Sequence, residues 1–150
     1  MQLNRVLNAV DEYAKVEIRT NLESASPHRI ILMMLDGAIE KLALGRGAMQ
    51  SGKTAEKGAN ISWAISIIDG LRASLNIDQG GQIAQNLDQL YDYMGRTLVD
   101  ANLHDNPNAV TEVIQLLQEI RAGWAGITPE ENGGALSTVN NIGPNAVGVG

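Results

Sequence analysis

The chain has 150 residues, the size of one ordinary domain, and a formal net charge of −6. It contains no cysteine and no phenylalanine, and aromatic residues make up only 3% of it. These counts exclude disulfides and thiolate metal sites, and they argue against a stacking surface for single-stranded nucleic acid. The acid excess lies in the second half, which repels phosphate backbones, so we expect no nucleic-acid partner. Because the two histidines, His28 and His104, lie far apart in sequence, we also expect no metal site.

The N-terminal segment shows no targeting signal. Charges are scattered through the first twenty residues, which is unlike a signal peptide. No stretch approaches the ~18 uninterrupted apolar residues of a membrane span. We therefore expect a cytoplasmic protein without membrane insertion. Leu3, Val6, Leu7 and Val10 predict a short helix within residues 1–25, and we expect this segment to pack on or cap the rest of the domain.

Helical periodicity begins at residue 26, and nothing alternates as a strand would. The first predicted helix opens at Ser26-Pro27, a capping serine followed by proline at the first helical position. Its apolar face continues to Met49, and glycines 45, 47 and 52 are expected to weaken its end and form a turn. The second helix carries its apolar stripe over residues 61–75 and is expected to stop within residues 76–81.

The third predicted helix has its apolar face over residues 83–101 and ends before Asn106-Pro107, because proline disfavours a helical residue before it. The fourth has its face over residues 110–124. Four amphipathic helices with short connections must have antiparallel neighbours. The expected fold is therefore all-α, an antiparallel up-down four-helix bundle over residues 26–127. Residues 128–150 are rich in glycine, have no basic residue and predict a flexible tail.

Residues 47–54 match the letters of a phosphate-binding loop, including Lys53 and Thr54. Such a loop must follow a buried β-strand, whereas this segment follows a long predicted helix. The acid that would complete the site, Asp69, falls inside the next helix. We interpret the segment as a helix–helix turn and expect no cofactor. A nucleotide-binding regulator, or a phosphotransfer regulator that uses a histidine, is the alternative function; both histidines are interpreted as capping or surface residues.

No catalytic arrangement can be assembled from this sequence, neither a Ser/His/Asp set nor an inward Glu-x-x-His pair, so we expect no enzyme. Apolar residues nevertheless remain outside the predicted core stripes. They are Ile30, Met33 and Leu44 in the first helix, Trp63 and Ile67 in the second, and Tyr93 and Leu116 in the last two. One interpretation is that they widen the core. The other is that they form a groove for an amphipathic partner segment.

Several segments resemble the flagellar export chaperone FliS family. Residues 24–39, SASPHRIILMMLDGAI, match the family's pattern almost throughout, and residues 60–75 also match. The strongest match is residues 80–94, GGQIAQNLDQLYDYM, which continues to Ala101-Asn102; Glu112-Val113 and Trp124 complete it. The resemblance covers about residues 13–127. The family usually has tyrosine or phenylalanine at the position of Leu35, and the glycine-rich tail has no counterpart.

The resemblance implies a bundle without enzymatic activity that binds the C-terminal segment of flagellin, prevents its premature polymerisation and delivers it to the export gate. In the family, a tyrosine-bearing segment before the first helix can cover part of the binding surface, and Tyr13 is the matching position. The expected groove residues are Tyr13, Ile30, Met33, Trp63, Ile67, Asn86, Tyr93 and Leu116. The sequence leaves monomer and homodimer both open.

Overall fold

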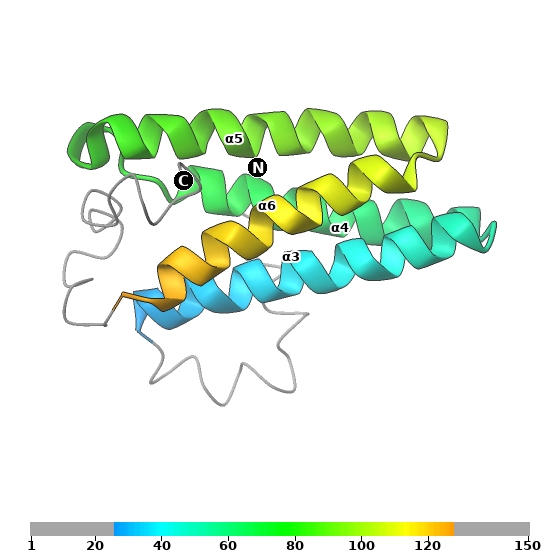
Figure 1. Ribbon diagram of the computed structural model, residues 1–150, viewed down its shortest axis with the longest axis horizontal. Coiled ribbons are helices and arrows are strands. Elements are labelled where there is room, and N and C mark those ends of the chain that lie inside the picture. The colour runs from blue at the N-terminus through cyan, green and yellow to red at the C-terminus, as the bar shows by residue number, and fades with distance from the viewer. Residues whose placement is uncertain (1–25, 128–150) are drawn as a thin grey trace.

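The computed structural model describes residues 26–127, which form four helices and contain no strand. They are α3 (Pro27–Gln50), α4 (Thr54–Ala73), α5 (Ile77–His104) and α6 (Pro107–Ala125). Each helix runs antiparallel to the next, and α3 and α5 occupy opposite corners, each between α4 and α6 (Figure 1). The predicted all-α, antiparallel up-down bundle is confirmed. The predicted N-terminal segment and glycine-rich tail lie outside the described residues.

The helices begin where their capping residues predict. The Ser26 hydroxyl accepts the backbone N–H of Arg29 at 3.2 Å, ahead of the proline that opens α3. Asn106 caps α6 in the same way, accepting the N–H of Ala109 at 3.2 Å. Each side chain satisfies one of the N–H groups that a helix start leaves without an internal partner.

The core is a continuous aliphatic layer between all four helices. Its fully buried larger side chains include Leu35 and Leu42 of α3, Ile61, Ile68 and Leu71 of α4, Met94 and Leu98 of α5, and Val113 and Leu117 of α6. Burying one such side chain contributes roughly 1.5–3 kcal/mol to stability. Leu35, the position at which the resemblance expects an aromatic residue, is wholly inside this layer.

α3 and α4 meet at Gly45. A Cβ built on Gly45 would lie 2.9 Å from Cγ1 of Ile61, so this close approach requires glycine. Gly45 and Gly47 both lie inside α3, which continues to Gln50, so neither of them forms the turn. The turn follows the end of α3, at Gly52. Its φ of 73° lies in the left-handed region, which glycine reaches without strain.

His28 and Trp124 join the start of α3 to the end of α6. The Trp124 indole N–H donates to the His28 carbonyl oxygen at 2.9 Å, and Nε2 of His28 lies 2.9 Å from the Trp124 carbonyl oxygen. Their rings stack with centroids 5.6 Å apart. The interpretation of His28 as a capping or surface residue was therefore wrong. His104 does lie at a helix end, with Nδ1 3.2 Å from the Asp100 carbonyl oxygen.

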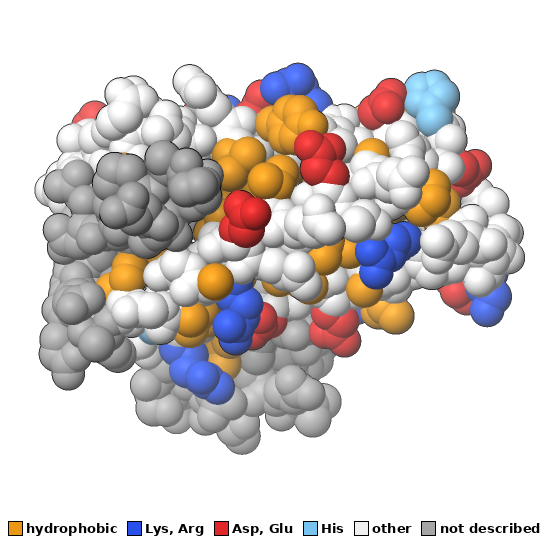
Figure 2. Space-filling model, viewed as in Figure 1, with side chains coloured by type: hydrophobic (Ala, Val, Ile, Leu, Met, Phe, Trp, Pro, Cys, Tyr) orange, Lys and Arg blue, Asp and Glu red, His pale blue; other side chains and the backbone are white. Residues whose placement is uncertain are grey.

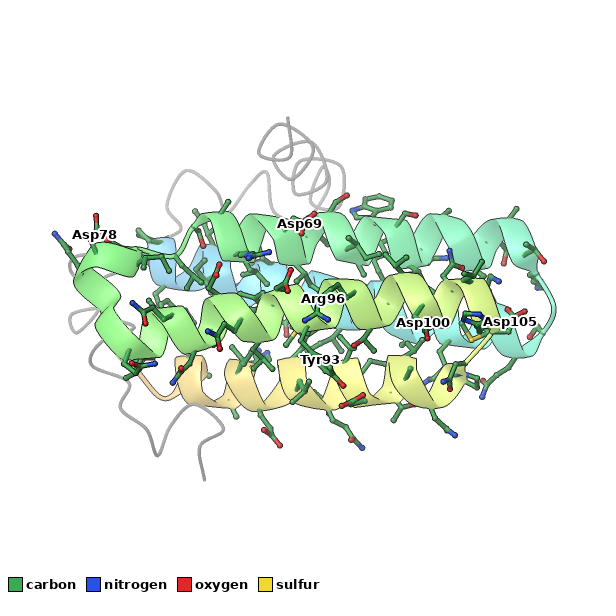
Figure 3. The ribbon with its side chains drawn as sticks, turned by 90° about the horizontal axis from the view of Figure 1, so that it is seen from above. Asp69, Asp78, Tyr93, Arg96, Asp100 and Asp105 are labelled. Carbon is green, nitrogen blue, oxygen red and sulfur yellow. The ribbon has the colours of Figure 1, made fainter. Side chains whose placement is uncertain are left out.

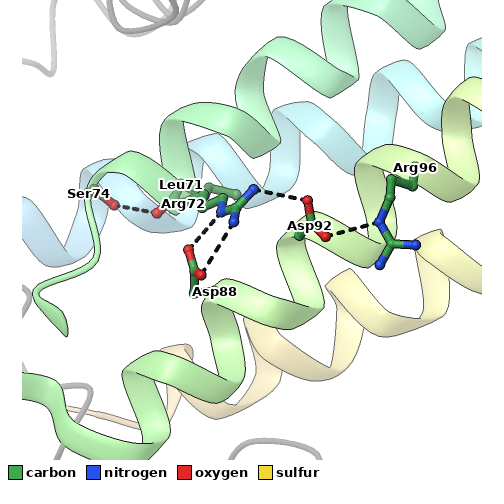
Figure 4. A network of polar contacts seen from close by, with 6 residues as sticks. All are labelled: Leu71, Arg72, Ser74, Asp88, Asp92 and Arg96. Carbon is green, nitrogen blue, oxygen red and sulfur yellow. Dashed lines mark hydrogen bonds and ion pairs between the residues drawn. The ribbon is translucent and has the colours of Figure 1, made fainter.

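Charged side chains bridge neighbouring helices at the bundle surface. Between α4 and α5, Arg72 donates to Asp88 at 2.7 Å and to Asp92 at 3.1 Å, and within α5 Arg96 donates to Asp92 at 3.0 Å (Figure 4). Between α3 and α6, Arg121 pairs with Asp36. Such part-exposed pairs contribute little to stability individually, but they fix which helix surfaces face each other.

Candidate partner-binding site

The phosphate-loop letters do not form a phosphate-binding loop. The segment comprises the end of α3, a turn at residues 51–53 and the start of α4, with no strand before it. Lys53 is exposed and its side chain makes no capping hydrogen bond to α4. Asp69 lies inside α4. The predicted helix–helix turn is thus confirmed, and the strand–loop–helix geometry that nucleotide phosphates need is missing from this segment.

The described residues offer neither a metal site nor a membrane span. Within residues 26–127, no group of three or more histidine or acidic side chains is placed to hold a metal ion. Of the four helices described, none is both long enough and apolar enough to cross a bilayer.

One candidate surface lies along α3 and α4. The spacing of Ile30, Met33 and Leu44 along the sequence places all three on one side of α3. Leu44 is 50% exposed. Trp63 of α4 is half-buried, and Nζ of Lys41 lies 4.0 Å from its ring centroid, which places the indole on the α3 side of α4. We call Ile30, Met33, Leu44 and Trp63 the α3–α4 face.

Ile67 does not belong to this face. It was expected outside the core stripe, as an i,i+4 partner of Trp63, but its side chain is only 1% exposed and packs in the core cluster. α4 is apolar around most of its circumference, so the period of its sequence does not define which side faces inward.

A second candidate surface lies along α5 and α6. The Tyr93 hydroxyl donates to Glu112 of α6 at 2.8 Å, and its side chain is 37% exposed. Asn86 is exposed and accepts from Gln82 at 2.9 Å, and Leu116 is half-buried against the core. We call Asn86, Tyr93 and Leu116 the α5–α6 face. Figure 2 shows hydrophobic side chains gathered between these two helices, with acidic ones beside them.

The predicted residues are therefore divided between two surfaces. In the order of helices around the bundle, the α3–α4 pair is opposite the α5–α6 pair. Ile30, Met33 and Trp63 lie on the first face, and Asn86, Tyr93 and Leu116 on the second. The expected groove residues of the described chain therefore do not form one continuous surface. Tyr13 lies outside the described residues.

The two sides of the bundle differ in charge. α5 carries four aspartates against one arginine, Arg96, whereas α3 carries Arg29, Lys41 and Arg46 against two acids. The hydrogen bond from Arg96 and the charge of Arg72 lower the pKa of Asp92, so this carboxylate stays ionised at neutral pH. The hydrogen bond to Asp88 in turn raises the pKa of Arg72.

The sequence interpretation missed other surface features. Lys41 was not connected with Trp63, because only the pairing of α3 with α4 brings them together. Val99 and Leu103 of α5 are 59% and 73% exposed and were not singled out. The sequence could have indicated them, because they are two large apolar residues four positions apart in a segment that also contains Asp100, Asn102 and His104.

The fold and these surfaces define an all-α four-helix bundle with partly exposed apolar side chains on its outer faces. A family model described as "Flagellar protein FliS" matches residues 9–131. The chain belongs to the FliS family of flagellar secretion chaperones.

Similar proteins from other bacteria carry the name of this family. The chain is 42% identical over 122 residues to the flagellar secretion chaperone FliS of Vibrio cholerae serotype O1, covering 81% of this chain and 90% of the relative. It is 43% identical over 122 residues to the flagellar secretion chaperone FliSB of Pseudomonas aeruginosa, covering 81% and 97%. The FliS of Salmonella typhimurium is 43% identical over 124 residues, covering 82% and 92%.

Proposed function

We propose that this chain binds the C-terminal segment of flagellin, prevents its premature polymerisation and delivers it to the flagellar export apparatus. Membership of a flagellar secretion chaperone family supports the general role. The observation that carries the proposal is the pair of partly apolar faces on opposite sides of one bundle, α3–α4 and α5–α6. No catalysis is part of this function, because the client is held and released without covalent change.

Two opposite faces suit a client that is long and lacks a fixed shape of its own. A compact protein would contact one side of the bundle, whereas an extended segment can lay one short helix on each face. Trp63 with Lys41 offers an aromatic and cationic anchor on the first face. Tyr93 offers an aromatic anchor on the second, with its hydroxyl already held by Glu112. Part of the gross contact energy is then spent on ordering the client.

Several finer elements belong to the same proposal. Tyr13 covers part of the binding surface before the client arrives, the loaded chaperone is recognised by a component of the export gate, and the complex forms in the cytoplasm. Ile67 is a core residue and is not one of the proposed contacts. The chain is active as a monomer or as a homodimer, and the mass of the complex in solution distinguishes the two states.

Calorimetric titration of the full chain with a flagellin C-terminal segment tests the proposal. Leu44→Ser removes an exposed apolar contact from the α3–α4 face, and Tyr93→Ala removes the anchor of the α5–α6 face. We expect each to weaken binding by about tenfold. Gln118→Ala changes an exposed residue of α6 outside both faces and should leave the affinity unchanged. Absence of binding up to about 50 µM, with helical protein confirmed, contradicts the proposal.

A further inference from the structure

Two exposed apolar side chains of α5 belong to neither candidate face. Val99 and Leu103 are the most exposed large hydrophobic residues within residues 26–127, at 59% and 73%. They follow Asp92 by seven and eleven residues, so they share its side of the helix. Asp92 is paired with Arg72 of α4. Val99 and Leu103 therefore lie along the outer edge between α5 and α4.

The neighbouring part of α4 is also open. Nζ of Lys57 donates to the Asn102 carbonyl oxygen at 2.9 Å and to Asp105 at 2.7 Å, so the start of α4 lies beside the end of α5. This pairing brings Gly58 to the level of Leu103, and Gly95 lies one turn before Val99. A Cβ built on either glycine would meet no atom within 4 Å. We call Gly58, Gly95, Val99 and Leu103 the α4–α5 strip.

The fold does not require either glycine of the strip. Gly45 must be glycine because a Cβ there would strike Ile61. Gly58 and Gly95 have free space around them, and neither has a positive φ. Glycine inside a helix lowers stability relative to alanine. A function that glycine does serve is the close approach of another backbone to the helix surface.

The charges around the strip favour a basic partner. Asp100 and Asp105 flank Leu103 in sequence. Asp105 is paired with Lys57 and Asp100 lies 3.1 Å from His104, yet their side chains remain 64% and 67% exposed. Figure 3 shows both at the C-terminal end of α5, beyond Arg96. The carbonyl groups at the end of a helix add partial negative charge at the same place. Lysine or arginine on an approaching segment would be complementary to this end of the strip.

We propose that the α4–α5 strip docks a helix of a second protein, distinct from the flagellin client. The docked helix carries small and apolar residues at i,i+4 spacing on its contact face, which pack over Gly58 and Gly95 between Val99 and Leu103. Lysine or arginine residues on its flanks lie near Asp100 and Asp105. Because Trp63 and Tyr93 lie on other sides of the bundle, this helix and the client can be bound at the same time.

A synthetic peptide provides the probe. It is about 15 residues long, with alanine and leucine on one helical face and lysine on its flanks, and a counterpart has glutamate in place of lysine. Titrated into the isotope-labelled full chain, the lysine peptide should shift the backbone amide resonances of Gly58, Gly95, Val99 and Leu103 but not of Gly47. Leu103→Ser should weaken it at least fivefold, and the glutamate peptide should bind at least tenfold more weakly.

Gly95→Ala distinguishes an effect on binding of the lysine peptide from an effect on the stability of the fold. Gly47 of α3 is its matched control, because it is also a helical glycine with no atom within 4 Å of a built Cβ. Both alanine variants should raise the melting temperature by about 2–5 °C. Only Gly95→Ala should weaken the lysine peptide, by about fivefold, because its methyl group holds the docked backbone away.

Four results would overturn the proposal. They are resonance shifts centred elsewhere than the strip, equal binding of the two peptides, a change in the mass of the free protein on Leu103→Ser, and loss of flagellin-segment affinity in that variant. The third would make the strip a contact between two copies of this chain, and the fourth would assign it to the client. Failure of the wild-type chain to bind flagellin would leave this proposal standing, since its readout is the peptide.

Discussion

α3 and α5 are parallel helices at opposite corners of one bundle, yet they are built differently. α3 packs more extensively on α4 and α6 than α5 does, and it includes a glycine that lets Ile61 approach its backbone. α5 has a glycine facing open space, two large apolar side chains in solvent and four aspartates. We infer that α3 contributes more to the stability of the fold, whereas more of the α5 surface is available for contacts with other molecules.

This division suits a chaperone. A bundle that binds other chains on several sides must keep its shape while its surfaces are covered and uncovered. Close packing around α3 supplies that stability, so residues on α5 can be apolar or unpaired without loss of the fold. Pairs of similar substitutions, one in each helix, test whether the two helices differ in this way.

The largest difference is expected between two leucines. Leu42→Ala in α3 removes a side chain with no exposed surface and should lower the free energy of unfolding by about 2–5 kcal/mol. Leu103→Ala in α5 removes one that is 73% exposed and should change it by less than about 0.5 kcal/mol. Urea denaturation followed by circular dichroism measures both. Comparable losses would contradict the division between the helices.

Aromatic hydrogen bonds give the next largest difference. Trp124→Phe removes the buried donor to the His28 carbonyl at the start of α3, and should lower the free energy of unfolding by about 1–3 kcal/mol. Tyr93→Phe on α5 removes only the exposed bond to Glu112, and should lower it by less than about 1 kcal/mol. Urea midpoints of the two variants against wild type check this prediction. It is wrong if Tyr93→Phe loses as much as Trp124→Phe.

Two glycine substitutions should change stability in opposite directions. Gly45→Ala forces its Cβ against Ile61 and should destabilise the fold by roughly 1 kcal/mol or more. Gly95→Ala meets nothing and should stabilise it by about 0.5–1 kcal/mol, because alanine favours the helix. Thermal unfolding followed by circular dichroism resolves the signs. Destabilisation by Gly95→Ala would show that α5 is packed as closely there as α3.

The smallest expected effect depends on pH. The Arg96 hydrogen bond lowers the pKa of Asp92 in the folded state, so the pair stabilises the protein above the ordinary aspartate pKa of about 4. That stability is lost as the pH falls through the lowered folded-state value. Asp92→Asn should therefore be slightly less stable than wild type at pH 7 and equal to it near pH 2, as measured by urea midpoints.

The control for this prediction is Asn86→Ala. It changes an exposed, uncharged residue of the same helix, so its difference from wild type should not vary with pH. A difference for Asp92→Asn that stays constant from pH 7 to about pH 2 would mean that the ion pairs of Asp92 with Arg96 and Arg72 contribute nothing to folding.

Local signals predicted the helices well. Ser26-Pro27 was correctly predicted as the start of a helix, and Asn106-Pro107 was correctly predicted to follow the end of the third helix. The phosphate-loop letters were recognised as a turn because the helix before them was itself predictable. The number of helices and their antiparallel order followed from periodicity and short connections.

Features that depend on how two helices meet were not predictable. His28 was taken for a surface residue because its partner, Trp124, lies 96 positions away. Ile67 was placed outside the core because α4 is apolar on most sides. The division of the predicted site between two faces has the same cause, since periodicity places a residue on its own helix but not relative to the other three.

We propose that one flagellin segment binds two opposite faces of the bundle. Hydrogen–deuterium exchange of the full chain, with and without the flagellin C-terminal segment, tests it most directly. The account predicts added amide protection both around Met33 and Trp63 and around Tyr93 and Leu116, with none around Gly47. Protection confined to one of the two faces, or absent from both when the segment is bound, would contradict it.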